Sequence, residues 1–254
     1  MTMTTMKDAV WDVMPTPYEV SARMAEIFMR ALANRAGDGG AVRVALSGGS
    51  TPREALAMLA RPYVASQIDW GRLEVYFSDE RCVPHDDPAS NIAMARQALL
   101  DHVPLKPGQI HPVPFEGTTP EGAQKAAAAY DALLKAQHTQ PGEPFFDLVM
   151  LGMGTDGHTA SLFPNTAALA ATSAWAAAGQ APVVPHQRVT LTYPALASSR
   201  LVAFMVTGAA KAPVTKALKS PAHSGATLPA GRVQTQGRLV ILADEAAMGV
   251  PKGS

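Results

Sequence analysis

Hydrophobic residues follow two patterns that alternate along the chain. In residues 18–35 the apolar positions Val20, Met24, Ile27, Phe28 and Leu32 recur at helical spacing before a glycine-rich stretch, so we predict a helix there. Comparable segments predict helices over residues 53–60, 91–100, 120–137 and 210–219, with a closing helical turn over 244–248. Short β-branched and aliphatic runs predict strands over residues 42–46, 73–77, 110–113, 145–151, 188–192, 201–206 and 239–242.

The order of these elements predicts the fold class. Strand, loop and helix alternate throughout, which indicates an α/β protein with a doubly wound, mainly parallel sheet of about six or more strands flanked by helices. The run from Phe145 to Leu151 is continuously apolar, as in a parallel strand buried on both faces. Residues 141–144 and 177–186 have the least regular pattern, and we take them as loops within one domain because no low-complexity linker divides the chain. We therefore expect a single domain over residues 1–254.

Composition narrows the classes of protein. The chain has 254 residues, 47% of them hydrophobic, and a formal net charge of zero, so no global positive field attracts nucleic acid or an anionic membrane. No stretch reaches the roughly 20 apolar residues of a membrane span, and residues 1–12 lack the pattern of a signal peptide, which predicts a cytoplasmic protein. Cys82 is the only cysteine, and neither HExxH nor CxxC spacing occurs. We expect no metal, no other cofactor and no obligatory protein partner.

Two glycine-containing loops after predicted strands suggest anion binding. Residues 47–52 combine Gly48 and Gly49 with the hydroxyls of Ser50 and Thr51 directly before a helix, and a helix N-terminus binds anions. This loop lacks the lysine and the spacing of a nucleotide-binding P-loop, and a tight turn in which Ser50 or Thr51 caps the helix is an equal alternative. Lys211 stands at the first turn of another helix, where a cation opposes the helix dipole unless an anion is present. The alternative there is an exposed surface lysine.

Charged residues directly follow the strand predicted over residues 73–77. Burying Asp79, Glu80 and Arg81 is costly unless they are paired or face a cleft. The planar guanidinium of Arg81 suits a phosphate or a carboxylate. The alternative is a salt bridge at the end of the strand.

The glycine-rich segment Gly152–Pro164 carries a candidate general base. Its GxGxxG spacing is typical of dinucleotide sites, but Pro164 leaves little room for the required helix and no acidic residue follows about 20 positions later. His158 has the imidazole suited to proton transfer near neutral pH, and Asp156 stands two residues before it. Whether this carboxylate contacts the ring is open at this point. The other six histidines lack such a setting, and we take them as structural.

Together these segments resemble 6-phosphogluconolactonases. The resemblance rests on residues 45–52, on Phe77–Arg81 with Ser90 and Asn91, on Gly152–Pro164, and on Thr207 and Gly208 with Lys211, in family order over residues 20–248. The related glucosamine-6-phosphate deaminases typically read Asp-Gly-His-Ile-Ala-Phe-Asn-Glu-Pro, with a catalytic carboxylate just after the histidine. Here Ser161, Leu162 and Phe163 occupy that stretch. The resemblance implies a Rossmann-like sheet, shared with the deaminases and with ribose-5-phosphate isomerases.

The resemblance also implies an activity and a set of site residues. The substrate would be 6-phospho-D-glucono-1,5-lactone, hydrolysed in the second step of the oxidative pentose phosphate pathway. His158 would be the catalytic base with Asp156 beside it. The implied residues for substrate and phosphate are Gly48, Gly49, Ser50, Thr51, Asp79, Arg81 and Lys211. Two alternatives remain, a glucosamine-6-phosphate deaminase and a non-catalytic sugar-phosphate-binding domain. Regulators of the second kind carry a helix-turn-helix, for which the stretch before Tyr18 has no room.

Overall fold

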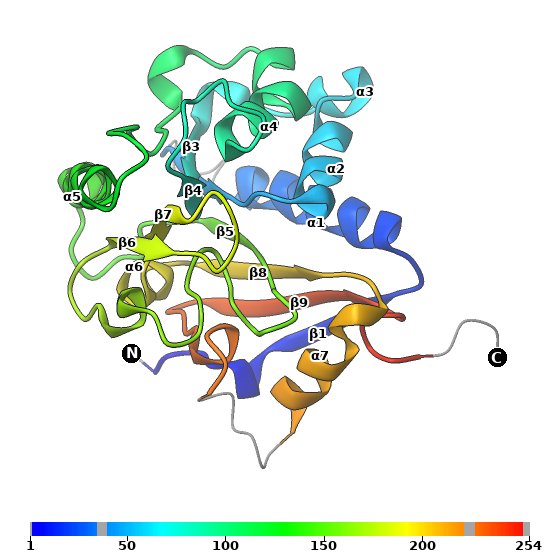
Figure 1. The fold of residues 1–254 in the computed structure, drawn as a ribbon. Helices are drawn as coiled ribbons and strands as arrows, with labels where there is room; N and C mark the ends of the chain where they lie inside the picture. Colours follow the sequence, from blue (N-terminus) through cyan, green and yellow to red (C-terminus); the bar gives the residue numbers. More distant parts are fainter. Residues whose placement is uncertain (1, 35–39, 221–226, 251–254) are drawn as a thin grey trace.

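A parallel six-stranded sheet forms the centre of the molecule (Figure 1). The computed structural model describes residues 2–34, 40–220 and 227–250. The strand order is β1-β9-β8-β5-β2-β3, and every neighbouring pair is parallel. The strands are β1 (Val10–Met14), β2 (Val42–Leu46), β3 (Leu73–Phe77), β5 (Leu148–Gly152), β8 (Leu201–Val206) and β9 (Arg238–Asp244). The predicted α/β class with a mainly parallel sheet is confirmed.

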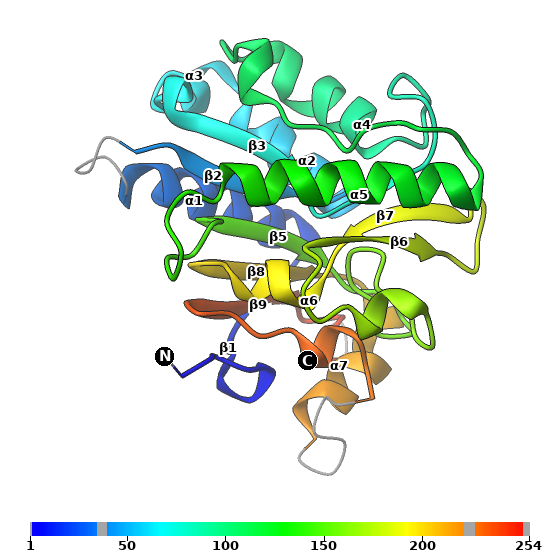
Figure 2. The same ribbon diagram turned by 90° about the vertical axis from the view of Figure 1, so that its left-hand side faces the viewer.

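Helices cover both faces of this sheet (Figures 1 and 2). α5 (Pro120–Gln137) lies on one face, whereas α1 (Pro17–Asn34) and α2 (Ser50–Leu59) pack together on the other. The shorter helices are α3 (Pro62–Ala65), α4 (Asn91–Ala98), α6 (Tyr193–Ala197) and α7 (Ala212–Lys219). Leu148, Val149, Met150 and Leu151 of β5 are fully buried between the two layers, as their continuous apolar run predicts. No helix among the described residues is long and apolar enough to cross a bilayer.

A second sheet changes part of the predicted picture. β4 (Asp79–Arg81), β6 (Ala176–Gln180) and β7 (Gln187–Leu191) form an antiparallel sheet in the order β4-β7-β6. The segments that hold β4 and most of β6 were expected to be loops. The strand predicted over residues 188–192 exists, but it belongs to this small sheet and not to the parallel one. β4 of this small sheet carries Asp79 and Arg81, two of the residues predicted for the site.

Two further predictions differ from the structure. The strand expected over residues 110–113 is reduced to an isolated bridge between Ile110 and Val75. Pro112 has no N–H group, so the ladder cannot continue past His111, whose N–H donates to the carbonyl of Val75. β1 was not expected at all. Its pattern is interrupted by Asp12, and its partner β9 lies at the other end of the chain.

Candidate functional site

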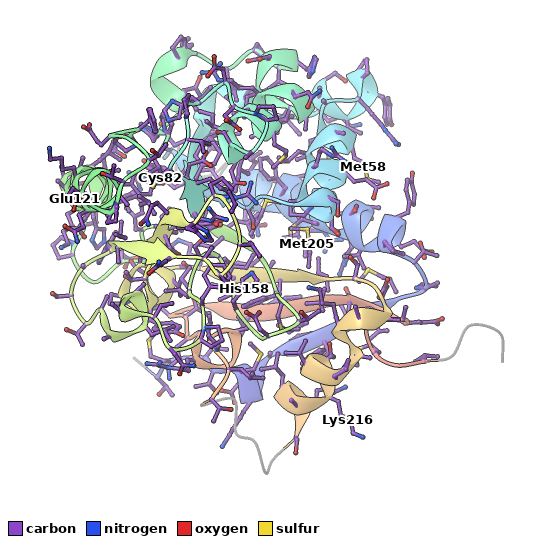
Figure 3. The ribbon with its side chains drawn as sticks, viewed as in Figure 1. Met58, Cys82, Glu121, His158, Met205 and Lys216 are labelled. Atoms are coloured by element: carbon purple, nitrogen blue, oxygen red, sulfur yellow. The ribbon has the colours of Figure 1, made fainter. Side chains whose placement is uncertain are left out.

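A cavity of about 350 Å³ lies at the carboxyl ends of the central strands. β2 is followed in the chain by β3 on one side of it, whereas β5 lies on its other side, so the topology reverses between β2 and β5. Open α/β sheets bind ligands at such a point. Loops after β2, β5 and β8 contribute to the cavity together with β4. His158 and Met205, which both line it, lie near each other in Figure 3.

The cavity brings together nearly all of the residues predicted from the sequence. Its lining includes Gly48, Gly49, Ser50, Thr51, Asp79, Arg81, His158 and Lys211. Asp156 is not part of the lining, and it contacts His158 from the side. Sequence reasoning had left Asn91, Ala160 and Thr207 out of the site, although they also line the cavity. Asn91 and Thr207 stand within the family-like segments, which was the available signal.

His158 and Asp156 form a close pair. The ring Nδ1 of His158 lies 2.6 Å from Oδ1 of Asp156, and the same oxygen accepts the backbone N–H of His158 at 3.1 Å. This geometry keeps the proton on Nδ1 and leaves the lone pair of a neutral ring on Nε2. No described residue hydrogen-bonds to Nε2, so that nitrogen can accept a proton from a ligand in the cavity. The ring also lies against Phe163, with centroids 4.3 Å apart.

The electrostatics of Asp156 favour its role as an orienting carboxylate. Partial burial raises the pKa of Asp156, but the hydrogen bonds from the backbone and ring of His158, together with the charge of that ring, outweigh it. The net result is a pKa of Asp156 below its ordinary value. Asp156 is therefore ionised at neutral pH and can stabilise a protonated His158.

The loop after β2 presents the N-terminus of α2 to the cavity. Gly49 precedes the helix with φ +109°, a conformation that favours glycine, and no side chain caps the helix. The alternative in which Ser50 or Thr51 caps the helix is therefore wrong. Instead, the hydroxyl of Thr51 lies 2.9 Å from that of Thr207, which joins this loop to the one after β8. The first N–H groups of α2 thus remain available to an anion.

Arg81 and Lys211 supply positive charge to the same cavity. No carboxylate of the described chain lies within ion-pair distance of either side chain; Arg81 donates to the backbone carbonyl of Ala89. The salt bridge considered for residues 79–81 does not form. Burial lowers the pKa of Lys211, and the nearby charge of Asp156 opposes this effect. Both cations are available to an anionic ligand.

Glu80 faces away from the cavity, toward α4. Its carboxylate accepts the backbone N–H groups of Asn91 at 2.7 Å and Ile92 at 2.9 Å, and the hydroxyl of Ser90 at 3.0 Å. Because side chains alternate along a strand, this leaves Asp79 and Arg81 on the opposite side of β4, where both line the cavity. Glu80 therefore has a structural role in starting α4.

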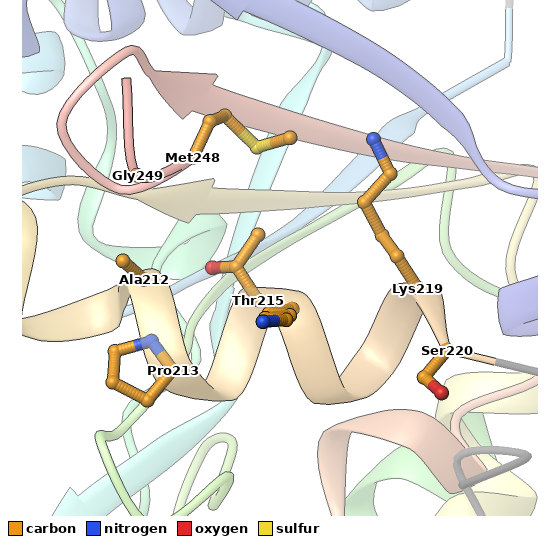
Figure 4. Close-up of a pocket in the computed structure, with 8 residues that line it drawn as sticks. Ala212, Pro213, Thr215, Lys219, Ser220, Met248 and Gly249 are labelled. Atoms are coloured by element: carbon orange, nitrogen blue, oxygen red, sulfur yellow. The ribbon is translucent and has the colours of Figure 1, made fainter. Parts of the chain in front are cut away.

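A larger hollow elsewhere carries no comparable chemistry. It measures about 770 Å³ and lies along α7 (Figure 4). Its lining includes Pro213, Thr215, Lys219 and Met248, and the ammonium of Lys219 also lies over the ring of Trp11 at 4.9 Å. None of the described residues that line this hollow carries an imidazole or a carboxylate. Among the described residues there is also no group of three or more histidine, cysteine or acidic side chains that could hold a metal ion.

The fold and the cavity define a class of α/β protein with a histidine–carboxylate pair and two positively charged side chains at the switch point of a parallel sheet. Residues 15–241 match the family of glucosamine-6-phosphate isomerases/6-phosphogluconolactonase, and the chain belongs to this family. It is 41% identical over 212 residues to a protein of Mycobacterium leprae named 6-phosphogluconolactonase. The aligned region covers 82% of this chain and 85% of the relative. The resemblance found in the sequence is confirmed.

Solved structures agree with this assignment. The 6-phosphogluconolactonase from Trypanosoma cruzi superposes with a TM-score of 0.84 at 27% identity and covers 100% of both chains. A monomeric glucosamine-6-phosphate deaminase superposes with a TM-score of 0.73 at 17% identity, over 95% of this chain and 100% of the other. At that identity the second likeness concerns the fold alone, which is the shared fold that the resemblance implied.

Proposed function

We propose that the protein is a 6-phosphogluconolactonase, which hydrolyses 6-phospho-D-glucono-1,5-lactone to 6-phospho-D-gluconate in the second step of the oxidative pentose phosphate pathway. One observation carries the proposal. His158, with Asp156 at 2.6 Å from its Nδ1, faces the same cavity as Arg81 and Lys211. A proton acceptor and an anion site thus share one pocket, as a phosphorylated ester substrate requires. The relatives that bear this name support the same activity.

The reaction needs one group that first takes and then returns a proton. Nε2 of His158 removes a proton from water as the water oxygen attacks the lactone carbonyl, which forms a tetrahedral oxyanion. When this intermediate collapses, the bond to the ring oxygen breaks and the imidazolium returns its proton to that oxygen. Asp156 stabilises the imidazolium between the two steps. General acid–base catalysis of this kind contributes about 10²–10⁴-fold.

Positive groups of the cavity bind the phosphate in this proposal. Arg81 offers a fork of donors, Lys211 a compact charge, and the N-terminus of α2 a set of N–H groups behind Gly48 and Gly49. Ser50 and Thr51 add hydroxyls that line the sugar pocket. Anchoring the phosphate orients the lactone carbonyl toward His158, which supplies the proximity part of the rate enhancement.

The deaminase alternative lacks a suitable acid. In the stretch after His158, Ser161 is hydrogen-bonded to Asp79, and Leu162 and Phe163 are buried. No carboxylate occupies these positions to assist ring opening. The remaining alternative, a binding domain without activity, provides no reason for a free Nε2 beside the anion site.

A direct assay tests the proposal. Freshly prepared 6-phosphogluconolactone should be hydrolysed far faster with the protein than in buffer alone, and addition of EDTA should not change the rate because His158 carries every proton transfer. Release of ammonia from glucosamine 6-phosphate at a comparable rate would support the deaminase instead. Binding of 6-phosphogluconate by a protein that does not accelerate hydrolysis of the lactone would support the binding domain. We further propose a cytoplasmic location, where phosphorylated sugars are retained, and no requirement for a nucleic acid, membrane or protein partner.

A further inference from the structure

Ser161 connects the loop of His158 to the small antiparallel sheet. Its hydroxyl donates to Oδ2 of Asp79 at 2.6 Å, and its backbone N–H donates to the hydroxyl of Thr190 at 3.1 Å. Asp79 belongs to β4 and Thr190 to β7. Ser161 is 1% exposed, so its side chain does not reach a ligand. Its two hydrogen bonds fasten the catalytic loop three residues after His158.

The acceptor of this hydrogen bond stands two residues before Arg81. Asp79 and Arg81 lie on the same side of β4, and both line the cavity. The bond between Ser161 and Asp79 therefore joins the loop that carries the base to the strand that carries the phosphate-binding guanidinium. These two segments are about 80 residues apart in the sequence, and the hydrogen bond spans 82 positions.

One of the two residues between the base and this anchor has an unusual backbone conformation. Ala160 has φ +48°, in the left-handed region that a residue with a Cβ rarely occupies. Strained backbone of this kind persists only where surrounding contacts hold it. Here the contacts are those of Ser161 on one side and the hydrogen bond from Thr159 to the carbonyl of Gly152, at 2.8 Å, on the other. The direction of the chain at His158 thus depends on the anchor.

Asp79 also connects to the loop after β2, through Asn91. Asn91 donates from Nδ2 to the backbone carbonyl of Asp79 at 2.8 Å and to Oδ1 of its carboxylate at 3.3 Å. The Oδ1 of Asn91 is buried without a hydrogen-bond partner and faces Gly48 so closely that a Cβ at that position would lie 2.0 Å away. Asp79 is accordingly the centre of a contact network that reaches the loops after β2 and β5.

We infer that Ser161 is a positioning residue, which acts through Asp79 to hold Nε2 of His158 at a constant distance from the phosphate-binding guanidinium of Arg81. The inference rests on the proposed lactonase function. It predicts that loss of the Ser161 hydroxyl disturbs the alignment of the base and leaves phosphate binding nearly intact. Misplacement of a reacting group by about 1 Å lowers a rate by as much as 10²-fold.

The experiment compares Ser161→Ala with Ser198→Ala in the full chain. Ser198 is also buried, and its hydroxyl accepts the N–H of Phe145 at 3.0 Å at the opposite end of the sheet, so it controls for the loss of a buried serine. We expect Ser161→Ala to lower kcat by about 10–100-fold with less than about threefold change in KM. Ser198→Ala should leave both constants unchanged. If Ser161→Ala does not fold, Ser161→Cys, which keeps the branching of the side chain but is slightly larger and a weaker donor, takes its place.

A double variant tests whether Ser161 acts through Asp79. In an Asp79→Ala background, Ser161→Ala should lower kcat by less than about threefold, because the partner is already absent. An equal loss in both backgrounds would overturn the inference.

An NMR measurement separates this inference from the proposed function. The Cε1–H resonance of His158, assigned with the His158→Gln variant, should shift or broaden in Ser161→Ala and stay in place in Ser198→Ala. An unchanged resonance in Ser161→Ala contradicts the positioning role whether or not the wild-type protein is a lactonase. An inactive wild type with a shifted resonance would contradict the function and leave the positioning role supported.

Discussion

The carboxylate of Asp156 lies 2.6 Å from Nδ1 of His158 although only one residue separates the two in the chain. Gly157, with φ +78°, makes the sharp turn between them. Gly154 permits the close approach, because a Cβ on it would lie 2.1 Å from Nδ1 of His158 and 2.4 Å from Oδ1 of Asp156. The pair is thus built within one short loop. Its remaining freedom is the position of that loop relative to the rest of the cavity.

Replacing the base should remove turnover and spare binding. We expect His158→Gln to lower kcat by about 10²–10⁴-fold with little change in KM, because the proposed phosphate-binding side chains are those of Arg81 and Lys211. His102→Gln is a matched control, since that exposed ring lies outside the cavity and its one hydrogen bond within the described residues goes to the carbonyl of Gln97. Steady-state kinetics on the phosphorylated lactone measure both constants. An unchanged kcat in His158→Gln would exclude His158 as the base.

Much of this site could be predicted from local sequence. The strands that end at Leu46, Phe77 and Val206 consist mainly of apolar residues, and the loops that follow them hold glycines and charges in a compact pattern. Because parallel strands share an edge, those loops had to meet. The cavity that contains Gly48, Arg81, His158 and Lys211 follows from this rule.

Contacts between distant segments could not be predicted in the same way. The sequence suggests no partner for Ser161, because its acceptor Asp79 lies on a three-residue strand at the edge of the small sheet, next to β7. A segment of three residues is too short to show the hydrophobic pattern from which a strand is predicted. Likewise, Glu80 was grouped with its charged neighbours, and only the position of α4 explains why it points away from the cavity.

Adding a methyl group to Gly154 should displace the catalytic pair. The Cβ of Gly154→Ala would overlap both His158 and Asp156, and one of them has to move. We expect kcat to fall at least tenfold, on the scale of a misplaced catalytic group. Gly108→Ala is the control, since a Cβ there meets nothing within 4 Å. Equal kinetics for the two variants would show that the loop absorbs the methyl group without moving the ring.

Removing a hydrogen-bond acceptor from Glu80 should lower the stability of the protein without changing its catalytic activity. In Glu80→Gln one of the two oxygens becomes an NH₂ group, which faces backbone N–H donors of Asn91 or Ile92 and leaves at least one of them unpaired. A buried unpaired donor costs about 1–3 kcal/mol. Urea unfolding of the variant and of the wild type measures this loss in the free energy of unfolding. A free energy within about 0.5 kcal/mol of the wild type would contradict the capping role.

Lys211 should contribute to binding and not to the chemical step. We expect Lys211→Ala to raise KM for the phosphorylated lactone at least tenfold and to leave kcat within a few-fold, because the base is untouched. Weak activity on unphosphorylated gluconolactone should be unaffected. Lys216→Ala, on the neighbouring helix α7 and outside the cavity, should behave as the wild type. An equal loss of activity on both lactones would show that Lys211 does not bind the phosphate.

The titration of Lys211 should appear in the pH dependence of product binding. Burial lowers the pKa of this lysine, so its charge is lost at a pH where an ordinary lysine is still protonated. In the proposed function the charged form binds the phosphate, so affinity for 6-phosphogluconate should be present below the lowered pKa and should decrease as the pH rises through it. Arginine keeps its charge over this range, and Lys211→Arg should therefore bind with an affinity that stays level. Isothermal titration calorimetry between neutral pH and about pH 10 compares the two, a range below the pKa of an unperturbed lysine. A parallel alkaline decrease in both proteins would assign the titration to another group.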